Sequence, residues 1–253
     1  MLLSNRRKLN KSKLLRLLDE LETAAGSGTS LYVLPGAPED EIQKTLDVAV
    51  GAEEVISDII RDAARSTTGA VLFWGERGKY LILPPFPVAE KAFVSGFDVK
   101  PLRLMLTKEL MIALVLLRLG AYAIGVFQEQ ILLASKVGTG NIHSRHRKGG
   151  SSERRFARHR EKEMEYFFTR VCGRVQERLE PYIERLDYLV YGGERHTLLA
   201  FRKRCEFLKR LDDRALVPLI NVREPKQATL EAAIEQVWSS EVIQWHDEGA
   251  DII

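Results

Sequence analysis

Residues 141–160 read NIHSRHRKGGSSERRFARHR, a paired-glycine turn surrounded by basic residues and followed at once by a helix start. Residues 143–162 contain eight Lys or Arg against two Glu, together with three of the five His of the chain. The whole chain carries a formal net charge of only +3, so this segment is a local electropositive site. The pattern predicts a loop that carries its backbone to a phosphate-rich target.

The sequence after the glycines predicts one long helix, residues 152–180, ended by Pro181. The first turns of this helix are rich in Arg, and apolar residues at helical spacing begin only later. We therefore expect the loop and the helix start to project from the body of the protein, with the later turns on the core. The apolar stripe consists of Met164, Phe167, Phe168, Val171, Val175 and Leu179.

The rest of the chain predicts a two-domain α/β protein with mixed sheets flanked by helices. With 253 residues, 45% hydrophobic and 29% charged, the chain is globular and long enough for two modest cores. We place a small α/β domain at residues 1–100. A second domain, residues 101–253, contains the basic glycine loop at 138–152 and the long helix.

Periodicity and turn signals predict the individual elements. In the first domain they predict a helix at 13–25, a strand at 30–34, one or two helices within 40–65, and a hairpin of strands 70–74 and 79–83. In the second they predict helices at 107–119, 197–210 and 229–237, a hairpin of strands 121–127 and 130–135, and strands at 188–191 and 216–220. Gly192-Gly193-Glu194 and Asp212-Asp213 are interpreted as connecting turns.

The sequence does not support a metal-binding, disulfide-bonded or membrane-spanning protein. Cys172 and Cys205 lack metal-ligand spacing and are expected to be reduced thiols in a cytoplasmic protein. The apolar run 110–127 is interrupted by Arg118 and two glycines, which argues against a membrane span. His143, His146 and His159 have no carboxylate or Cys at ligand spacing, so we expect RNA-contacting histidines, with no metal and no cofactor.

Residues 149–158, GGSSERRFAR, resemble the GGQ loop and following helix of archaeal and eukaryotic class I peptide chain release factors, whose pattern is GGQSxxRFAR. The register holds without a gap through Ser152 and residues 155–158. A weaker resemblance extends to residues 21–31, to the 122–135 hairpin and to the strand and helix units after Pro181. It implies a second domain like the GGQ hydrolase domain of that superfamily.

The chain also differs from the family pattern, and these differences restrict the function that we expect. No Asn-Ile-Lys-Ser-type loop lies between residues 46 and 65, and the chain ends where a third domain would begin, so we expect no stop-codon reading. Ser151 stands where the family has its catalytic Gln. The Vms-like branch, which frees nascent chains from split large subunits in ribosome quality control, has its Gln slightly further along the loop, where this chain has Glu153. The chain therefore resembles a bacterial, Vms-like relative.

The resemblance implies a peptidyl-tRNA ester hydrolase acting in ribosome rescue or quality control. Its implied partners are the large ribosomal subunit at the peptidyl-transferase centre, ribosomal RNA and peptidyl-tRNA, with no membrane. The implied catalytic residues are Gly149, Gly150, Ser151 and Glu153. The RNA-binding residues are Arg145, Arg147, Lys148, Arg154, Arg155, Arg158 and Arg160. Two alternatives remain open: a non-catalytic ribosome- or RNA-binding protein on the same scaffold, and a nuclease that acts on the tRNA 3′ end.

Overall fold

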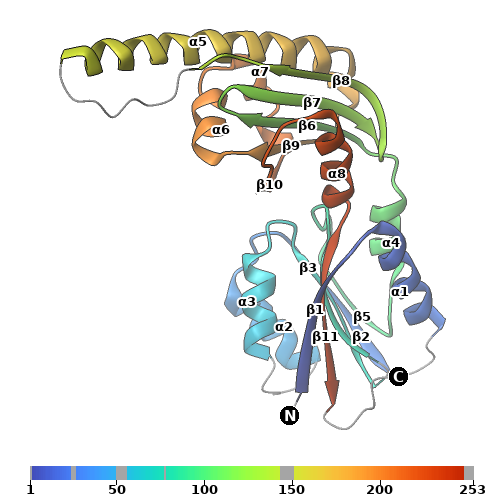
Figure 1. Cartoon of the computed structure of the whole chain (residues 1–253). Helices are drawn as coiled ribbons and strands as arrows, with labels where there is room; N and C mark the ends of the chain where they lie inside the picture. The colour runs from blue at the N-terminus through green and yellow to red at the C-terminus, as the bar shows by residue number, and fades with distance from the viewer. Residues whose placement is uncertain (1, 24–26, 50–55, 77, 143–150, 248–253) are drawn as a thin grey trace. The chain divides into compact units, whose positions relative to one another are not determined.

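The computed structural model describes residues 2–23, 27–49, 56–76, 78–142 and 151–247, which fold into two compact units (Figure 1). The first unit consists of Met1–Lys108 together with Val237–Ile253, and the second of Glu109–Gln236. Each unit combines one β-sheet with helices, which confirms the expected α/β architecture.

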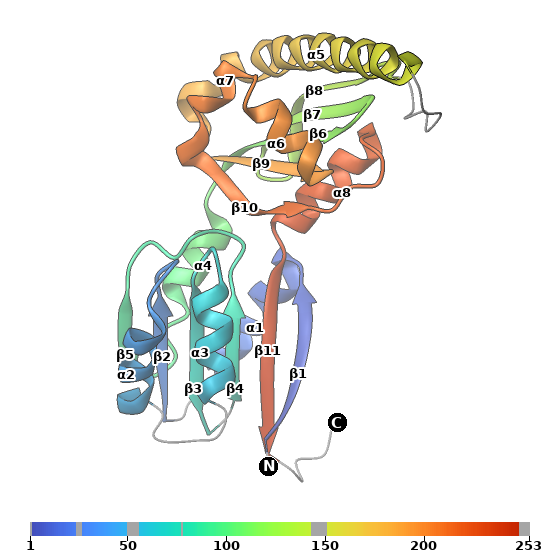
Figure 2. The same ribbon diagram turned by 90° about the vertical axis from the view of Figure 1, so that its left-hand side faces the viewer.

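The first unit contains a six-stranded antiparallel sheet in the order β1-β11-β4-β3-β2-β5, with helices on both faces (Figure 2). Alternate side chains of a strand point to opposite faces, so Leu31 and Leu72 pack against α2 and α3 while Tyr32 and Phe73 pack against α1 and α4. The elements of this unit are β1 (Leu2–Leu9), α1 (Lys11–Thr23), β2 (Gly28–Val33), α2 (Glu39–Ala49), α3 (Ile56–Arg65), β3 (Ala70–Gly75), β4 (Gly78–Leu83), β5 (Ala92–Ser95), α4 (Lys100–Thr107) and β11 (Ser240–Asp247).

The second unit contains a mixed five-stranded sheet in the order β10-β9-β6-β7-β8. Strands β6, β9 and β10 run parallel, whereas β7 pairs antiparallel with both β6 and β8. Helices α5, α6 and α7 share one core on one face of the sheet. The elements are β6 (Met111–Arg118), β7 (Ala121–Gln128), β8 (Ile131–Thr139), α5 (Ser151–Leu179), η1 (Glu180–Arg185), β9 (Tyr188–Gly193), α6 (Arg195–Arg202), α7 (Glu206–Lys209), η2 (Asp212–Arg214), β10 (Ala215–Ile220) and α8 (Gln227–Val237).

The helix predicted at residues 107–119 is wrong, because Met111–Arg118 forms strand β6 and the preceding helix, α4, ends at Thr107. Strand β6 lies between β9 and β7, and every residue from Met111 to Leu117 is buried. A strand covered on both faces is apolar at every position, so its sequence shows no alternation. Such a run has the same hydrophobic pattern as a buried helix.

The expected division at residue 100 differs from the structure at two points. Helix α4 belongs to the first unit, because Leu102 and Leu106 pack in the same core as α1. The segment Ser240–Asp247 also belongs there, since as β11 it pairs with both β1 and β4. The strand partners of a segment lie far away in the sequence, so its local pattern did not indicate which sheet it joins.

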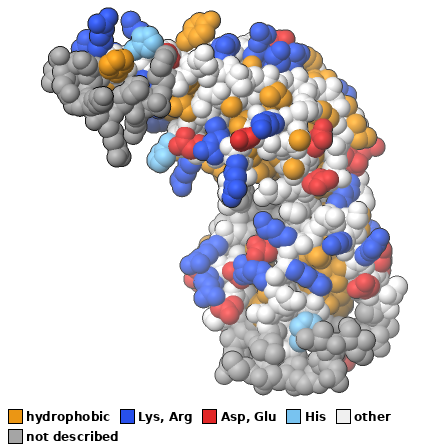
Figure 3. All heavy atoms as spheres, viewed as in Figure 1, with side chains coloured by type: hydrophobic (Ala, Val, Ile, Leu, Met, Phe, Trp, Pro, Cys, Tyr) orange, Lys and Arg blue, Asp and Glu red, His pale blue; other side chains and the backbone are white. Residues whose placement is uncertain are grey.

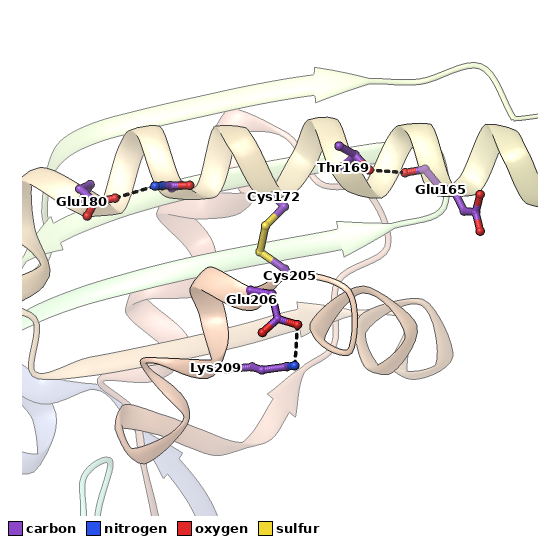
Figure 4. The surroundings of a disulfide bond; sticks show 8 residues. Glu165, Thr169, Cys172, Glu180, Cys205, Glu206 and Lys209 are labelled. Carbon is purple, nitrogen blue, oxygen red and sulfur yellow. Dashed lines mark hydrogen bonds and ion pairs between the residues drawn. A yellow bond between two sulfur atoms is a disulfide. The ribbon is translucent and has the colours of Figure 1, made fainter.

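The expectation of reduced cysteines is also wrong, because Cys172 and Cys205 form a disulfide with a Cα–Cα distance of 5.5 Å (Figure 4). The bridge joins α5 to the residue that begins α7, and Cys205 is fully buried. The two cysteines are 33 residues apart in sequence. Only the packing of α5 on the turn between α6 and α7 brings them together.

Candidate functional site

The structure describes only part of the predicted loop. Arg145, Arg147, Lys148, Gly149 and Gly150 lie outside the described residues. The next four residues, 151–154, form the first turn of α5, but their side chains also lie outside the described part of the chain. The predicted assignments of Ser151, Glu153 and Arg154 therefore stay predictions. The described part of the site consists of the helix and the strand that carry the loop.

Helix α5 carries the loop on a firmly packed base. Phe167, Phe168 and the apolar positions up to Leu179 are buried in the core of the second unit. The Phe168 ring lies 6.0 Å from that of Phe167 and 5.8 Å from that of Phe201 on α6. Such ring contacts hold the direction of the helix, because each aromatic pair restricts the next.

The first turns of α5 lie outside this core. Arg155, Phe156 and Arg158 are exposed, whereas Arg160 is half-buried. A helix rises about 1.5 Å per residue. Ser151 precedes Phe167 by 16 positions, so the helix start lies about 24 Å along the axis from the packed part. Figure 1 shows this part of α5 projecting past the sheet. The prediction that the helix start projects from the body is confirmed.

The other end of the loop is attached to the packed part of α5. The Gly140 N–H donates to the Gly120 carbonyl at 2.9 Å, and Arg170 Nη2 donates to the Thr139 carbonyl at 2.6 Å. A Cβ at Gly140 would lie 2.6 Å from Phe167 Cδ2 and 2.8 Å from Arg170 Nη2. Only glycine allows so close an approach. The end of β8 is thus held against the middle of α5.

An open groove of about 640 Å³ lies between the end of β8 and α5. One wall consists of Gly140 and Asn141, and the other contains His159, Lys162, Tyr166 and Arg170 from α5. The Tyr166 side chain is 72% exposed. Cationic groups beside an exposed aromatic ring suit a nucleic-acid strand, because the cations neutralise phosphates and the ring stacks on bases.

Sequence reasoning included His159 among RNA-contacting residues but missed Lys162, Tyr166 and Arg170 as members of the groove. Their spacing of four residues places them in one row along α5. This spacing can be read from the sequence and could have predicted that the three residues share one surface. His159 Nδ1 lies 3.2 Å from Glu163 Oε1, so this histidine faces a carboxylate on its own helix.

The two ends of α5 differ in their electrostatics. Near its C-terminus, Arg174 and Arg178 both pair with Glu177, at 2.7 and 3.4 Å. The hydrogen bond from Arg174 holds the pKa of Glu177 below its ordinary value. Within the described residues, Arg155 and Arg158 form no ion pair. Lys and Arg side chains accordingly gather over the projecting part of α5 (Figure 3), where their charge remains available to an anionic partner.

Two negative findings apply to the described residues. They contain no group of three or more His, Cys, Asp or Glu that could hold a metal ion. They also contain no helix that is both long enough and apolar enough to cross a membrane. Of the three histidines near the loop, His143 and His146 lie outside this part of the chain.

Comparison with known proteins adds a family relationship. The family model for the Actinobacteria/chloroflexi VLRF1 release factor matches residues 111–243. Peptide chain release factor subunit 1 of Archaeoglobus fulgidus (strain ATCC 49558 / DSM 4304 / JCM 9628 / NBRC 100126 / VC-16) is 27% identical over 212 residues. That alignment covers 72% of this chain and 52% of the relative, so the chain spans about half the length of this release factor.

Two solved structures show a weaker likeness. The crystal structure of the archaeal translation termination factor aRF1 has a TM-score of 0.40 and 20% identity, with 91% of this chain and 73% of that chain covered. The Vms1 mitochondrial localization core has a TM-score of 0.44 and 12% identity, with 75% and 82% covered.

Proposed function

The chain belongs to the Actinobacteria/chloroflexi VLRF1 release factor family, and from this premise we propose that it hydrolyses the ester between peptide and tRNA on stalled ribosomes. The observation that carries the proposal is that the matched span contains GGSSERRFAR, residues 149–158, at the start of a helix that projects from its core. We propose action in ribosome rescue or quality control, without stop-codon reading. The cell compartment is the cytoplasm, and no cofactor is required.

The proposed reaction is attack of water on the ester carbonyl, which yields the free peptide and the 3′ hydroxyl of the tRNA. The loop must be thin, because RNA lines the peptidyl-transferase centre on every side. Gly149 and Gly150 provide a thin backbone there. Backbone N–H groups at the start of α5 are suitable donors for the developing oxyanion, since a helix N-terminus favours negative charge.

Glu153 is the proposed residue that positions water. A carboxylate oxygen accepts a hydrogen bond from water as the amide oxygen of the family's Gln does. The hydroxyl of Ser151, or that of Ser152, is assigned to capping the helix N-terminus, a role that stabilises a helix by about 1 kcal/mol. The ribosome and the tRNA supply the rest of the chemistry, so Glu153 need not be a strong base.

The proposed partners are the large ribosomal subunit, its ribosomal RNA and peptidyl-tRNA. Three features support this choice. They are the exposed cations at the start of α5, the groove with Tyr166 at the loop root, and the firm packing of the later helix. The loop root is the end of β8 at Thr139 and Gly140. Arg145, Arg147, Lys148, Arg154, Arg155, Arg158 and Arg160 are the proposed phosphate contacts. Each phosphate that is neutralised releases counterions, so binding by these residues falls steeply with added salt.

Single-turnover release on purified, stalled large subunits tests the proposal. Glu153→Ala should lower the release rate by roughly an order of magnitude or more, whereas Glu153→Gln should keep much of it. Gly150→Ala should abolish release with the fold intact. Ser151→Ala should mainly lower thermal stability. Glu165→Ala changes an exposed carboxylate on the same helix and is the matched control.

A gel that resolves peptidyl-tRNA, full-length tRNA and shortened tRNA distinguishes the alternatives. Free peptide with full-length tRNA supports ester hydrolysis, and peptide on a shortened tRNA indicates a nuclease. Binding without either product indicates a non-catalytic RNA-binding protein. Full activity in Glu153→Ala would refute the role of this carboxylate and leave backbone amides and ribosomal groups as the catalyst.

A further inference from the structure

The carboxyl ends of the three parallel strands in the second unit form one edge of the sheet, and the loop root lies on the same edge. Register places Leu117, the second-last residue of β6, beside Gly193, the last residue of β9. Strand β10 ends beside β9, with Ile220 opposite Gly192. Strand β8 ends on this side too, because Thr139 pairs with Ala121 at the start of β7. Ligands of open α/β sheets commonly bind outside such carboxyl ends.

This edge carries three arginines, Arg118, Arg195 and Arg223, which we call the strand-edge arginines. All three are exposed. Arg118 Nη1 donates to the Val222 carbonyl at 3.4 Å, so Arg118 contacts the residue that precedes Arg223. The N–H of Glu194 donates to the Leu117 carbonyl at 3.1 Å, so the residues that precede Arg195 and Arg118 are bonded to each other. Arg118 ends β6, Arg195 begins α6 directly after β9, and Arg223 follows the end of β10, so the chain places one cation at the carboxyl end of each parallel strand.

The close approach of the end of β9 to β6 makes this arrangement possible. Gly193 has a φ of +119°, and a Cβ there would lie 2.0 Å from the Leu117 carbonyl oxygen. Any other residue would push the turn away from β6. Of the Gly192-Gly193-Glu194 motif, interpreted from sequence as a connecting turn, only Glu194 connects, because both glycines belong to β9 and pair with β6. The motif brings the start of α6 to the end of β6.

The charge of the strand-edge arginines is not neutralised by neighbouring side chains. Within the part of the chain that the structure describes, none of the strand-edge arginines forms an ion pair. The two nearby carboxylates have other partners: Glu194 accepts from Thr197, and Glu224 pairs with Lys226. By contrast, Arg202 on α6 pairs with Asp212 at 2.6 Å. Exposed, unpaired cations along one sheet edge suit a row of phosphates.

We infer that the strand-edge arginines bind the backbone of the tRNA acceptor arm while the loop reaches its 3′ end. Neighbouring strands lie about 4.8 Å apart, so the edge extends from the loop root at β8 across β6 and β9 to β10, a span of about 19 Å. An RNA whose 3′ end lies at the loop continues covalently beyond it, and we place its next phosphates along this edge. The inference rests on the proposed function, because it takes peptidyl-tRNA as the substrate.

The test measures binding of the full chain to an RNA hairpin that has the acceptor stem and single-stranded 3′ end of a tRNA. Fluorescence anisotropy at salt concentrations from about 50 to 200 mM gives the salt dependence. The variant Arg118→Ala/Arg195→Ala/Arg223→Ala should bind about tenfold or more weakly, and the slope of log K against log salt should fall by about two to three. Equal melting curves by circular dichroism verify that the variant is folded.

The matched control removes three exposed cations from other parts of the same unit: Arg185→Ala/Lys203→Ala/Arg210→Ala. Its net charge is the same, so a nonspecific charge effect would weaken both variants equally and overturn the inference. The strand-edge triple variant is also tested on a short single-stranded RNA. If it loses as much affinity for this RNA as for the hairpin, the inference is overturned, because the stem would not be the ligand. Equal competition by poly-glutamate would indicate an acidic protein partner instead.

Peptide release by the same proteins separates this inference from the proposed function. If the wild-type chain binds the hairpin through the strand-edge arginines but releases no peptide, the RNA-binding surface is supported and the proposed hydrolysis is refuted. If the wild type releases peptide and the triple variant binds the hairpin as tightly as the wild type, the proposed hydrolysis stands. In that case only the RNA-binding role of the strand-edge arginines is refuted.

Discussion

Reduction of the Cys172–Cys205 disulfide should lower the free energy of unfolding of the second unit. The bridge closes a segment with a sequence separation of 33 residues. In the chain-entropy model, a cross-link of this length restricts the unfolded chain and stabilises the fold by about 3.7 kcal/mol at 25 °C. Because Cys205 is fully buried, reduction is a cleaner perturbation than truncation, which would also leave a small cavity.

Urea denaturation followed by far-UV circular dichroism measures this effect on oxidised and reduced protein. With a slope of about 2 kcal/mol per molar urea, the midpoint of the second unit should fall by about 2 M. Tryptophan fluorescence gives an internal reference, because all three Trp residues, Trp74, Trp238 and Trp245, belong to the first unit. Coincident curves for the two redox forms, or two free thiols in unreduced protein, would refute the reasoning.

Three further changes test the packing of the second unit. Gly140→Ala should destabilise it by about 1–3 kcal/mol, because the added methyl overlaps Phe167; an unchanged urea midpoint would contradict this account of the loop root. Tyr191→Phe should raise stability by about 1 kcal/mol, since the buried hydroxyl has no hydrogen-bond partner among the described residues; a lower midpoint would indicate a hidden partner. Burial raises the pKa of Tyr188 and Tyr191, so the folded state favours the neutral phenols. Their contribution to the free energy of unfolding should therefore be complete below a pH of about 10, the ordinary tyrosine pKa, and should decline above it. Urea midpoints that stay constant from about pH 9 to 11 would argue against this.

Local sequence patterns were sufficient for features that depend on neighbouring residues. The long helix α5, its exposed basic start and its later apolar stripe all follow from a period of 3.6 residues and from Pro181. The hairpin of β3 and β4 follows from its glycine turn. The similarity of residues 149–158 to release factors is equally local, and the family match at residues 111–243 agrees with it.

Tertiary structure alone decided the features that join distant segments. Met111–Arg118 is a strand because β7 and β9 cover both its edges, although its apolar run equally fits a helix. Ser240–Asp247 joins the first sheet through hydrogen bonds to β1 and β4, which no local pattern specifies. The same holds for the disulfide, the groove beside Tyr166 and the strand-edge arginines. Each needs side chains from separate elements within a few ångströms, and in the folded chain those distances are determined by packing of the whole sheet and its helices.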